Sequence, residues 1–187
     1  MIHGCGRLIW VSSDLVTRPS PSVRLMRPGD LASVAAIQAD SYHPHYLEDD
    51  ATLRARLNEF PDTAWVAQGP AGVCAYLVAY RSVLGKITPL GGHFHSPALP
   101  NCLYLHDLAV STAAAGQGLG PALVSHALAV ARQEGLAYCA LVSVQGSQAF
   151  WQRLGFRATT LDDPRERQHL ATYLGAAVYM TQALAAN

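Results

Sequence analysis

The stretch Leu103–Glu134, LYLHDLAVSTAAAGQGLGPALVSHALAVARQE, decides how the rest of the chain is organised. Its first part, Leu103–Val110, is rich in Leu, Val and Tyr and predicts a buried strand that carries one histidine and one aspartate. Three glycines follow at alternate positions: Gly116, Gly118 and Gly120. Their spacing predicts a tight turn directly after the strand.

An amphipathic helix follows this turn. Its apolar residues are spaced to share one face: Leu119, Leu123, Ala127 and Val130. Pro121 fits only near the helix start, where a missing N–H breaks no helical hydrogen bond. A glycine-rich turn that opens a helix exposes several backbone amides beside the positive end of the helix dipole. The stretch therefore predicts a phosphate-binding site.

Two common phosphate-binding folds do not fit this context. A dinucleotide-binding fold has its glycine fingerprint after the first strand of a repeated βαβ series, whereas several predicted strands precede Gly116 here. A Walker-type nucleotide site needs Gly-Lys-Ser/Thr, and Gly120 is followed by Pro121. Both classes are excluded.

Composition favours one globular domain without nucleic-acid or membrane partners. The 187 residues have a formal net charge of zero, so no basic surface for nucleic acid or anionic lipid is expected. No apolar run approaches the roughly 20 residues that span a bilayer. The cysteines are scattered without a CxxC pair: Cys5, Cys74, Cys102 and Cys139. Strand context for three of them predicts free thiols and a reducing, cytoplasmic location.

The chain divides into an N-terminal extension, residues 1–22, and one domain, residues 23–187. The extension ends in a Pro-Ser linker and is expected to be loosely ordered. Its apolar segment LIWV is too short for a signal-peptide core. Arginines and serines in the same segment leave a transit peptide open as an alternative.

Periodicity and turn residues predict a mixed α/β or α+β domain around one sheet. Asp30 is expected to cap the first helix, and residues 162–169 read as a polar loop. The long segment 82–101 reads as a loop that could close over a site. Strands are predicted at 23–27, 64–68, 73–81, 103–110, 136–144, 156–160 and 173–181, and helices at 31–39, 51–59, 147–154 and after the glycine turn.

The sequence resembles the GNAT N-acetyltransferases in three places. LAV at Leu108–Val110, followed by GQGLG at Gly116–Gly120, resembles the acetyl-CoA motif of that family. FWQRLGF at Phe150–Phe156 resembles its second motif, and VRLMRPGDLASVAAI resembles its first strand and helix. The resemblance covers roughly Val23–Thr181. It implies a single α+β domain with a mixed, largely antiparallel sheet, splayed at the acetyl-CoA strand and flanked by about four helices.

The resemblance also implies acetyl-CoA as cosubstrate, without a metal. Backbone amides of the turn would hold the pyrophosphate, the strand segment would pair with the pantetheine arm, and two aromatic residues would line the thioester end. The cofactor-binding residues are therefore predicted to be Leu108, Ala109, Val110, Ala115, Gly116, Gln117, Gly118, Leu119, Gly120, Pro121, Phe150 and Trp151.

Two positions depart from the family pattern. Ala115 stands where the family has Arg or Gln, so one side-chain contact to phosphate is missing. Trp151 stands where a tyrosine usually protonates the leaving thiolate, and an indole N–H is too weak an acid for that step. Ser147, Tyr173 or a water remain as sources of the proton, or the thiolate leaves unaided.

His106 is the predicted general base. Strand alternation points Tyr104, His106 and Leu108 to one face, and Leu105 and Asp107 to the other. An imidazole suits base catalysis at neutral pH, although the residues alone leave a structural core histidine open.

A closer likeness favours the catalytic role. LYLHDLAV and GQGLGPAL are similar to segments of the arylalkylamine (serotonin) N-acetyltransferases, in which both histidines of the strand are implicated in deprotonating the amine. The second corresponds to His106, whereas Tyr104 replaces the first and is expected to line the site as a helper. Asp107 is expected to be structural.

The loop SYHPHYLEDD is predicted to form the acceptor side of the site. Its aromatic and imidazole groups would contact the substrate: Tyr42, His43, His45 and Tyr46. Glu48, Asp49 or Asp50 could attract an ammonium group, although a solvated polar loop fits the same composition. His93, His95 and Cys102 are spaced too irregularly to predict a metal site.

The sequence therefore predicts an acetyl-CoA-dependent N-acetyltransferase that acts on a small primary amine of arylalkylamine or polyamine type. Acetylation of a protein N-terminus or lysine, and non-catalytic acyl-CoA binding, stay open as alternatives. The acceptor's identity and the oligomeric state, including a homodimer, are not determined by the sequence.

Overall fold

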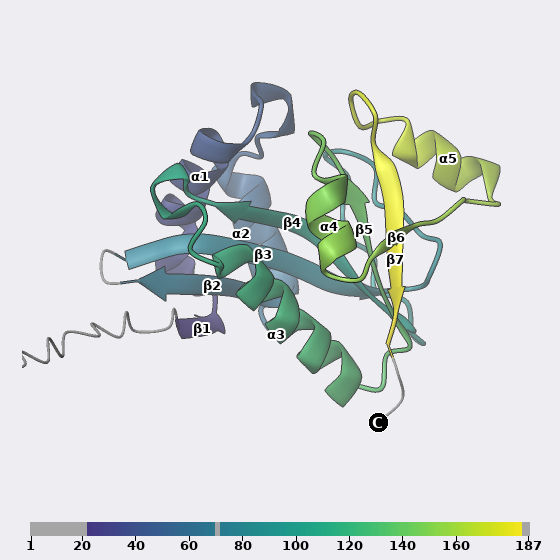
Figure 1. The fold of residues 1–187 in the computed structure, drawn as a ribbon, viewed down its shortest axis with the longest axis horizontal. Coiled ribbons are helices and arrows are strands. Elements are labelled where there is room, and N and C mark those ends of the chain that lie inside the picture. The colour runs from purple at the N-terminus through teal and green to yellow at the C-terminus, as the bar shows by residue number, and fades with distance from the viewer. Residues whose placement is uncertain (1–21, 70–71, 185–187) are drawn as a thin grey trace, which may run out of the picture.

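The computed structural model describes residues 22–69 and 72–184, which form a seven-stranded mixed sheet (Figure 1). The strands lie in the order β1-β2-β3-β4-β5-β7-β6. Every neighbouring pair is antiparallel except β4–β5, which is parallel. The strands are β1 (Ser22–Leu25), β2 (Ala64–Gly69), β3 (Gly72–Ser82), β4 (Cys102–Val110), β5 (Tyr138–Ser143), β6 (Arg157–Ala158) and β7 (Val178–Ala183).

Helices cover both faces of the sheet and complete the predicted α+β domain (Figure 1). α3 lies across one face, and α1 and α2 lie behind the opposite face. The prediction of about four flanking helices is confirmed: the four predicted segments correspond to α1, α2, α3 and α4, and α5 is additional. The helices are α1 (Leu31–Ser41), α2 (Asp50–Glu59), α3 (Leu119–Gln133), α4 (Gln148–Arg153) and α5 (Pro164–Leu170).

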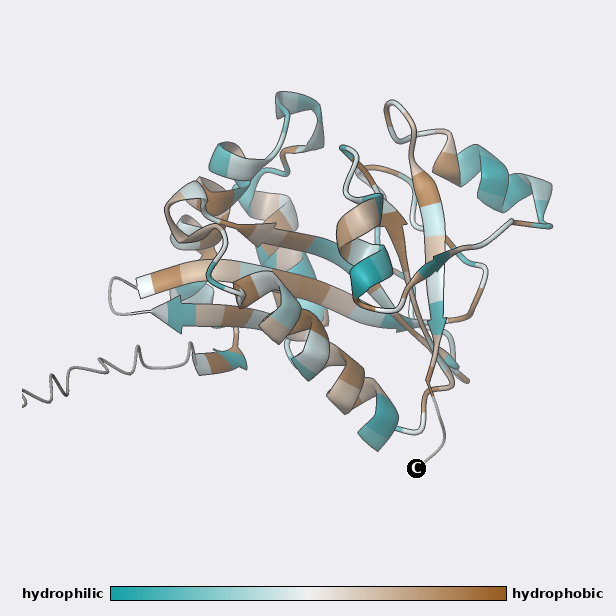
Figure 2. Ribbon diagram, in the orientation of Figure 1, coloured by the Kyte–Doolittle hydropathy of each residue, from teal (hydrophilic) through white to brown (hydrophobic). Residues whose placement is uncertain are grey.

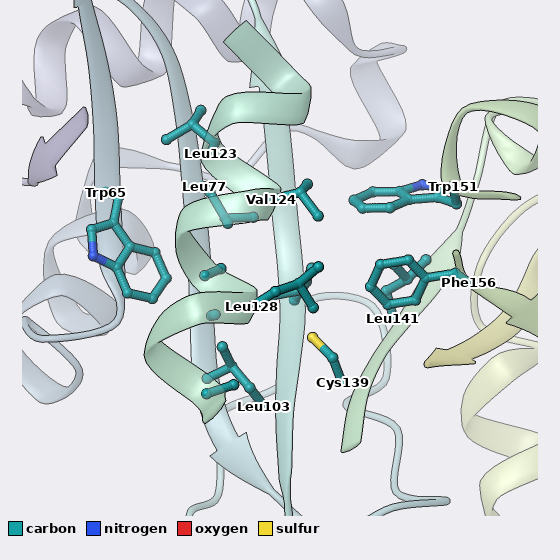
Figure 3. Close-up of a cluster of buried hydrophobic side chains, with 14 of the residues drawn as sticks. Trp65, Leu77, Leu103, Leu123, Val124, Leu128, Cys139, Leu141, Trp151 and Phe156 are labelled. Atoms are coloured by element: carbon teal, nitrogen blue, oxygen red, sulfur yellow. The ribbon is translucent and has the colours of Figure 1, made fainter. Parts of the chain in front are cut away.

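The core under α3 is apolar throughout (Figure 3). Leu123, Val124 and Leu128 of α3 point at the sheet, as the predicted helical face requires, while Val130 is only half-buried. Trp151 and Phe156 close the side of this core that faces α4. Apolar residues dominate the central strands, whereas α5 is largely hydrophilic (Figure 2). α3 is therefore fixed to the sheet by apolar burial.

The most consequential irregularity of the sheet lies in β4. Against β3, Val78 pairs with Asp107 and Ala79 with Leu105, so His106 is the extra residue of a β-bulge. Against β5, the pairing ends at Leu105 with Leu141, although β4 continues to Val110. The two parallel strands therefore diverge beyond Leu105, and the predicted splay of the sheet is confirmed.

The bulge makes the predicted alternation along β4 wrong. Leu108 packs with Leu105 on the α3 side, although simple alternation places them on opposite faces. Asp107 instead contacts Tyr42 from the α1 side, the side on which Tyr104 is buried. One extra residue shifts every following side chain to the other face.

Residues 162–169 were predicted as a polar loop, but they contain most of α5. Pro164 occupies the first helical turn, and the Asp163 carboxylate accepts from the backbone N–H of Arg165 at 2.9 Å. Only Glu166 of this helix is buried, and it accepts from the N–H of Ile87 at 2.8 Å. A helix with one buried residue gives no hydrophobic periodicity, so the pattern could not reveal it.

The N-terminal part differs from its prediction in detail. The predicted extension, residues 1–22, lies outside the described residues except for Ser22, which begins β1. Asp30 precedes α1 but makes no side-chain cap. Its carboxylate instead accepts from the Arg24 guanidinium at 2.7 and 2.8 Å and from the N–H of Arg27 at 2.7 Å. Asp30 therefore fastens β1 to the start of α1.

Leu123→Ala should lower the free energy of unfolding by about 2–5 kcal/mol, because it leaves a cavity in the α3 core. Leu123 is 0% exposed, whereas Leu99 is 88% exposed. Leu99→Ala is therefore the matched control and should change stability by less than about 0.5 kcal/mol. Urea unfolding of the two variants measures both values. Equal losses would contradict the assignment of this core.

Candidate functional site

The glycine turn between β4 and α3 forms a cavity of about 500 Å³. Gly116 and Gly118 have φ values of 75° and 77°, a left-handed conformation that glycine adopts without strain. A Cβ on Gly120 would lie 3.3 Å from the Phe150 ring, so this glycine permits α3 to approach α4 closely. The cavity is lined by Leu108, Val110, Ala114, Ala115, Gly116, Gly118, Leu119, Gly120, Pro121, Phe150 and Arg153.

A second cleft, of about 240 Å³, opens where β4 and β5 diverge. It shares Leu108, Val110 and Phe150 with the turn cavity, so the two adjoin. Its lining also includes Ala109, predicted to contact the pantetheine arm, and Trp151, predicted to line the thioester end. The full set is Ser41, Tyr42, Leu105, His106, Leu108, Ala109, Val110, Val142, Val144, Gln145, Ser147, Phe150 and Trp151.

Hydroxyl groups at the end of α1 reach the diverging part of β4. The Ser41 hydroxyl donates to the carbonyl of Val110 at 3.0 Å, and the Tyr42 hydroxyl lies 2.8 Å from the carbonyl of Leu108. Each carbonyl oxygen retains a second lone pair. The strand segment can therefore still accept hydrogen bonds from a molecule in the cleft.

Of the two side chains named as proton sources in place of a tyrosine at Trp151, Ser147 lines this cleft. Trp151 is 7% exposed and packs edge-on against Phe150 and Phe156. The Ser147 hydroxyl contacts the Ser143 hydroxyl at 2.9 Å and donates to the carbonyl of Val144 at 2.8 Å. The remaining candidate residue, which lies outside the cleft lining, is Tyr173.

A third pocket, of about 40 Å³, lies on the far side of His106 from the turn. It shares His106 and Tyr42 with the cleft, so the two spaces adjoin. The Tyr46 hydroxyl donates to the carbonyl of Leu174 at 2.8 Å and ties the loop after α1 to the segment before β7. The pocket is lined by Tyr42, Tyr46, Glu48, Leu90, His106, Asp107, Val142, Val144 and Tyr173.

His106 belongs to a buried charged cluster that links this pocket to α2. Its Nε2 lies 2.9 Å from Nη1 of Arg56 and 3.5 Å from Oε1 of Glu48. Arg56 also forms a short ion pair with Oε2 of Glu48 and donates to the carbonyl of Gly92 at 3.1 Å. The Phe94 ring packs edge-on against His106, with ring centroids 4.6 Å apart.

The charges in this cluster balance within it. Burial raises the pKa of Glu48, but the neighbouring His106 and Arg56 outweigh burial and hold the pKa below its ordinary value. Glu48 is therefore a carboxylate at neutral pH. Oε2 of Glu48 is paired with Arg56, so Oε1 remains to receive a further donor.

Asp107 lies behind His106 in a separate network of hydroxyls. The hydroxyls of Tyr42 and Tyr76 each donate to its carboxylate at 2.6 Å, and Gln38 donates at 3.2 Å. Burial raises the pKa of Asp107 despite these bonds, and burial also raises the pKa of both tyrosines well above the ordinary value. Asp107 therefore holds the bulge in place, in keeping with its predicted structural role.

Several predicted residues lie outside these spaces. Tyr104 is 1% exposed, lines none of the three, and burial raises its pKa well above the ordinary value. His43 and His45 are exposed and do not line the acceptor-side pocket, unlike Tyr42 and Tyr46. Gln117 does not line the turn cavity. The Asp49 side chain caps α2 by accepting from the N–H of Thr52, and Asp50 is exposed.

The sequence interpretation missed Arg56, and it included Phe94 only as part of the long loop that could close over a site. Arg56 is 7% exposed and follows Leu53 by three residues, which places it on the buried face of α2. An arginine among the apolar positions of a helix was the available signal, since buried charges are rare and paired. Phe94 lies in the long loop, where no periodicity shows which side chains turn inward.

Within the described residues, no group of three or more His, Cys, Asp and Glu side chains is arranged to hold a metal ion. The described part of the chain also has no helix long and apolar enough to cross a membrane. Its three cysteines are free thiols in β3, β4 and β5: Cys74, Cys102 and Cys139. Cys5 lies outside the described residues.

Sequence comparison identifies the family. The model of the acetyltransferase (GNAT) family matches residues 31–156, more than half of the chain. The protein therefore belongs to the GNAT family of acyl-CoA-dependent acetyltransferases. None of the curated proteins matches the sequence significantly.

Solved structures share the fold at low sequence identity. The GphF GNAT-like decarboxylase in complex with isobutyryl-CoA is 21% identical, with a TM-score of 0.72 over 88% of this chain and 100% of that chain. The loading GNATL domain of CurA from Lyngbya majuscula is 14% identical, with a TM-score of 0.71 over 88% and 98%. The ribosomal-protein-S18-alanine N-acetyltransferase from Escherichia coli is 15% identical, with a TM-score of 0.64 over 89% and 96%. These neighbours differ in activity, so the fold alone does not give the acceptor.

Gly118→Ala should weaken coenzyme A binding, because it strains the turn that carries the exposed amides. Gly135→Ala is the matched control: Gly135 has a φ of 72°, close to the 77° of Gly118, and follows the other end of α3. Both variants should lose about 1–3 kcal/mol of stability. Calorimetric titration with coenzyme A should show weaker binding for Gly118→Ala only. Equal affinities of the two variants would contradict the phosphate role of the turn.

Proposed function

We propose that the protein transfers an acetyl group from acetyl-CoA to the amine of a small molecule, with His106 as the general base. One observation carries this proposal: His106 lines both the cleft between β4 and β5 and the adjoining pocket with Glu48. An amine in that pocket and a thioester in the cleft would meet at this imidazole.

The donor would bind along the path from the glycine turn to the cleft. Amides of the turn at the start of α3 would hold the pyrophosphate. The pantetheine arm would lie beside Leu108–Val110, where β4 has left β5. Phe150 and Trp151 would then enclose the thioester, since both line the cleft. Ala115 contributes no charged contact, so backbone donors carry the phosphate interaction.

The acceptor would bind with its ammonium group at Glu48. Oε1 of this carboxylate is directed toward His106, and the surrounding pocket has three tyrosine rings that suit an aryl or alkyl substituent. The hydrogen bond from Tyr46 to Leu174 ties together the two segments beside this pocket. These features support a small amine over a peptide. The likeness of the β4 segment to arylalkylamine N-acetyltransferases supports the same class.

The chemistry follows from this placement. His106 accepts a proton from the ammonium group, and the neutral amine attacks the thioester carbonyl carbon. The tetrahedral adduct then gives the second proton of its nitrogen to water, the C–S bond breaks, the amide forms, and the thiolate leaves. Trp151 cannot protonate that thiolate. The Ser147 hydroxyl lines the cleft and could turn from the carbonyl of Val144 to donate a hydrogen bond to the sulfur, while the proton itself comes from water.

A panel of acceptors separates this function from its alternatives. Coenzyme A release should accelerate with primary arylalkylamines or polyamines, and not with peptides that offer a free N-terminus or lysine. Faster turnover of the peptides would favour the protein acetyltransferase. Acetyl-CoA binding without turnover of any amine would favour the non-catalytic module and contradict the proposal.

The same assay tests the base. His106→Gln should reduce kcat/KM by about 10²–10⁴-fold, the usual contribution of a general base. His126→Gln is the control, because His126 lies on α3 against Trp65, on the other side of the sheet. Full activity of His106→Gln at neutral pH would remove His106 from the mechanism.

A further inference from the structure

We propose that Arg56 is a positioning residue that fixes the tautomer of His106. A guanidinium group is always charged and can only donate hydrogen bonds. Nη1 of Arg56 lies 2.9 Å from Nε2 of His106, so Nε2 must be the acceptor. In a neutral imidazole the hydrogen then resides on Nδ1. The basic lone pair is thereby placed at Nε2, on the side of Glu48.

Glu48 would impose the opposite tautomer if Arg56 were absent. A carboxylate only accepts hydrogen bonds, and Oε1 of Glu48 lies 3.5 Å from Nε2 of His106. An imidazole that served this carboxylate would place a hydrogen on Nε2 and lose its lone pair there. Arg56 prevents this by donating to Glu48 Oε2 and to Nε2 together. Arg56 and His106 therefore compete to be the partner of one buried carboxylate.

The contacts of Arg56 show how the guanidinium is held in this place. Nη2 donates to the carbonyl of Gly92 at 3.1 Å, and the Phe94 ring centroid lies 4.3 Å from Cζ. Phe94 also packs against the His106 ring. The long loop thus holds both the Arg56 guanidinium and the His106 ring, through Gly92 and Phe94. Glu48 is held separately, because its N–H donates to Gln38 at 2.8 Å.

Burying these three polar side chains costs desolvation energy, which indicates that they have a role beyond stability. The exposed side-chain fractions are 7% for Arg56, 10% for Glu48 and 7% for His106. Apolar residues of similar volume often replace a buried ion pair without loss of stability. The Nδ1 atom of His106 has no hydrogen-bond partner among the described residues, so only a contact at Nε2 can select the tautomer. Arg56 is the group that does.

This role rests on the proposed function, because the tautomer matters only if His106 accepts a proton. An ammonium group at Glu48 Oε1 lies beside Nε2. Its proton moves to Nε2, the nitrogen keeps the electron pair of the broken N–H bond, and the amine becomes neutral. Arg56 loses its bond to Nε2 and retains those to Glu48 and Gly92. Oε1 of Glu48, 3.5 Å from Nε2, then faces the new imidazolium, and the cluster carries one net positive charge.

The tautomer can be measured directly, without substrate. Protein labelled with ¹⁵N-histidine gives two-bond nitrogen–proton correlations that distinguish Nδ1–H, Nε2–H and imidazolium forms, and His106→Gln assigns the resonances. Wild-type protein should show His106 as the Nδ1–H tautomer. Arg56→Met should convert it to the Nε2–H or imidazolium form. Arg54→Met, an exposed arginine on the same helix, should leave the wild-type pattern unchanged.

An Nε2–H pattern in the wild type would overturn the role of Arg56, as would an unchanged pattern in folded Arg56→Met. If Arg56→Met fails to fold, the wild-type pattern alone decides. Amine turnover is measured in a separate assay, so the role of Arg56 and the proposed function can be refuted independently. An Nδ1–H pattern without acetyl transfer would support the tautomer lock and refute the proposed function.

Discussion

The divergence of β4 from β5 beyond Leu105 is the constraint on which the other features depend. Up to this residue the two parallel strands are paired, and the sheet is continuous. Beyond it, the cleft opens and the β4 backbone faces that space. The bulge at His106 falls at the same point and turns the following residues over. The sheet therefore opens at the same position of β4 that places the His106 imidazole.

The two faces of the sheet have different tasks. The α3 face is an apolar core that fixes the glycine turn, because Leu119 and Leu123 anchor the helix directly after it. The α1 and α2 face holds the two carboxylates of the site, and each is paired: Asp107 with tyrosine hydroxyls, and Glu48 with Arg56. His106 lies on this second face, next to both adjoining spaces.

Local sequence signals predicted most of the fold and half of the site. The glycine turn and α3 followed from backbone requirements that act within a few residues, whereas the splay followed from the resemblance to the GNAT family. The face of the sheet on which Leu108 lies was not predicted. A bulge depends on the partner strand and does not change the alternation of apolar and polar residues in the sequence. Arg56 was missed because its partners, Glu48 and His106, come from other segments. Tyr104, predicted to line the site, is buried because its ring packs against Tyr80 from the neighbouring strand.

A structure with bound acetyl-CoA, or an unreactive thioether analogue of it, tests the central claim most directly. The account predicts the pyrophosphate at Gly116–Gly120, the pantetheine arm between β4 and β5, and the acyl carbon at the cleft end beside His106. An amine at Glu48 should then come within about 3.5 Å of that carbon. A coenzyme bound outside the splay, or an acyl group separated from His106 by the β4 backbone, would contradict the account.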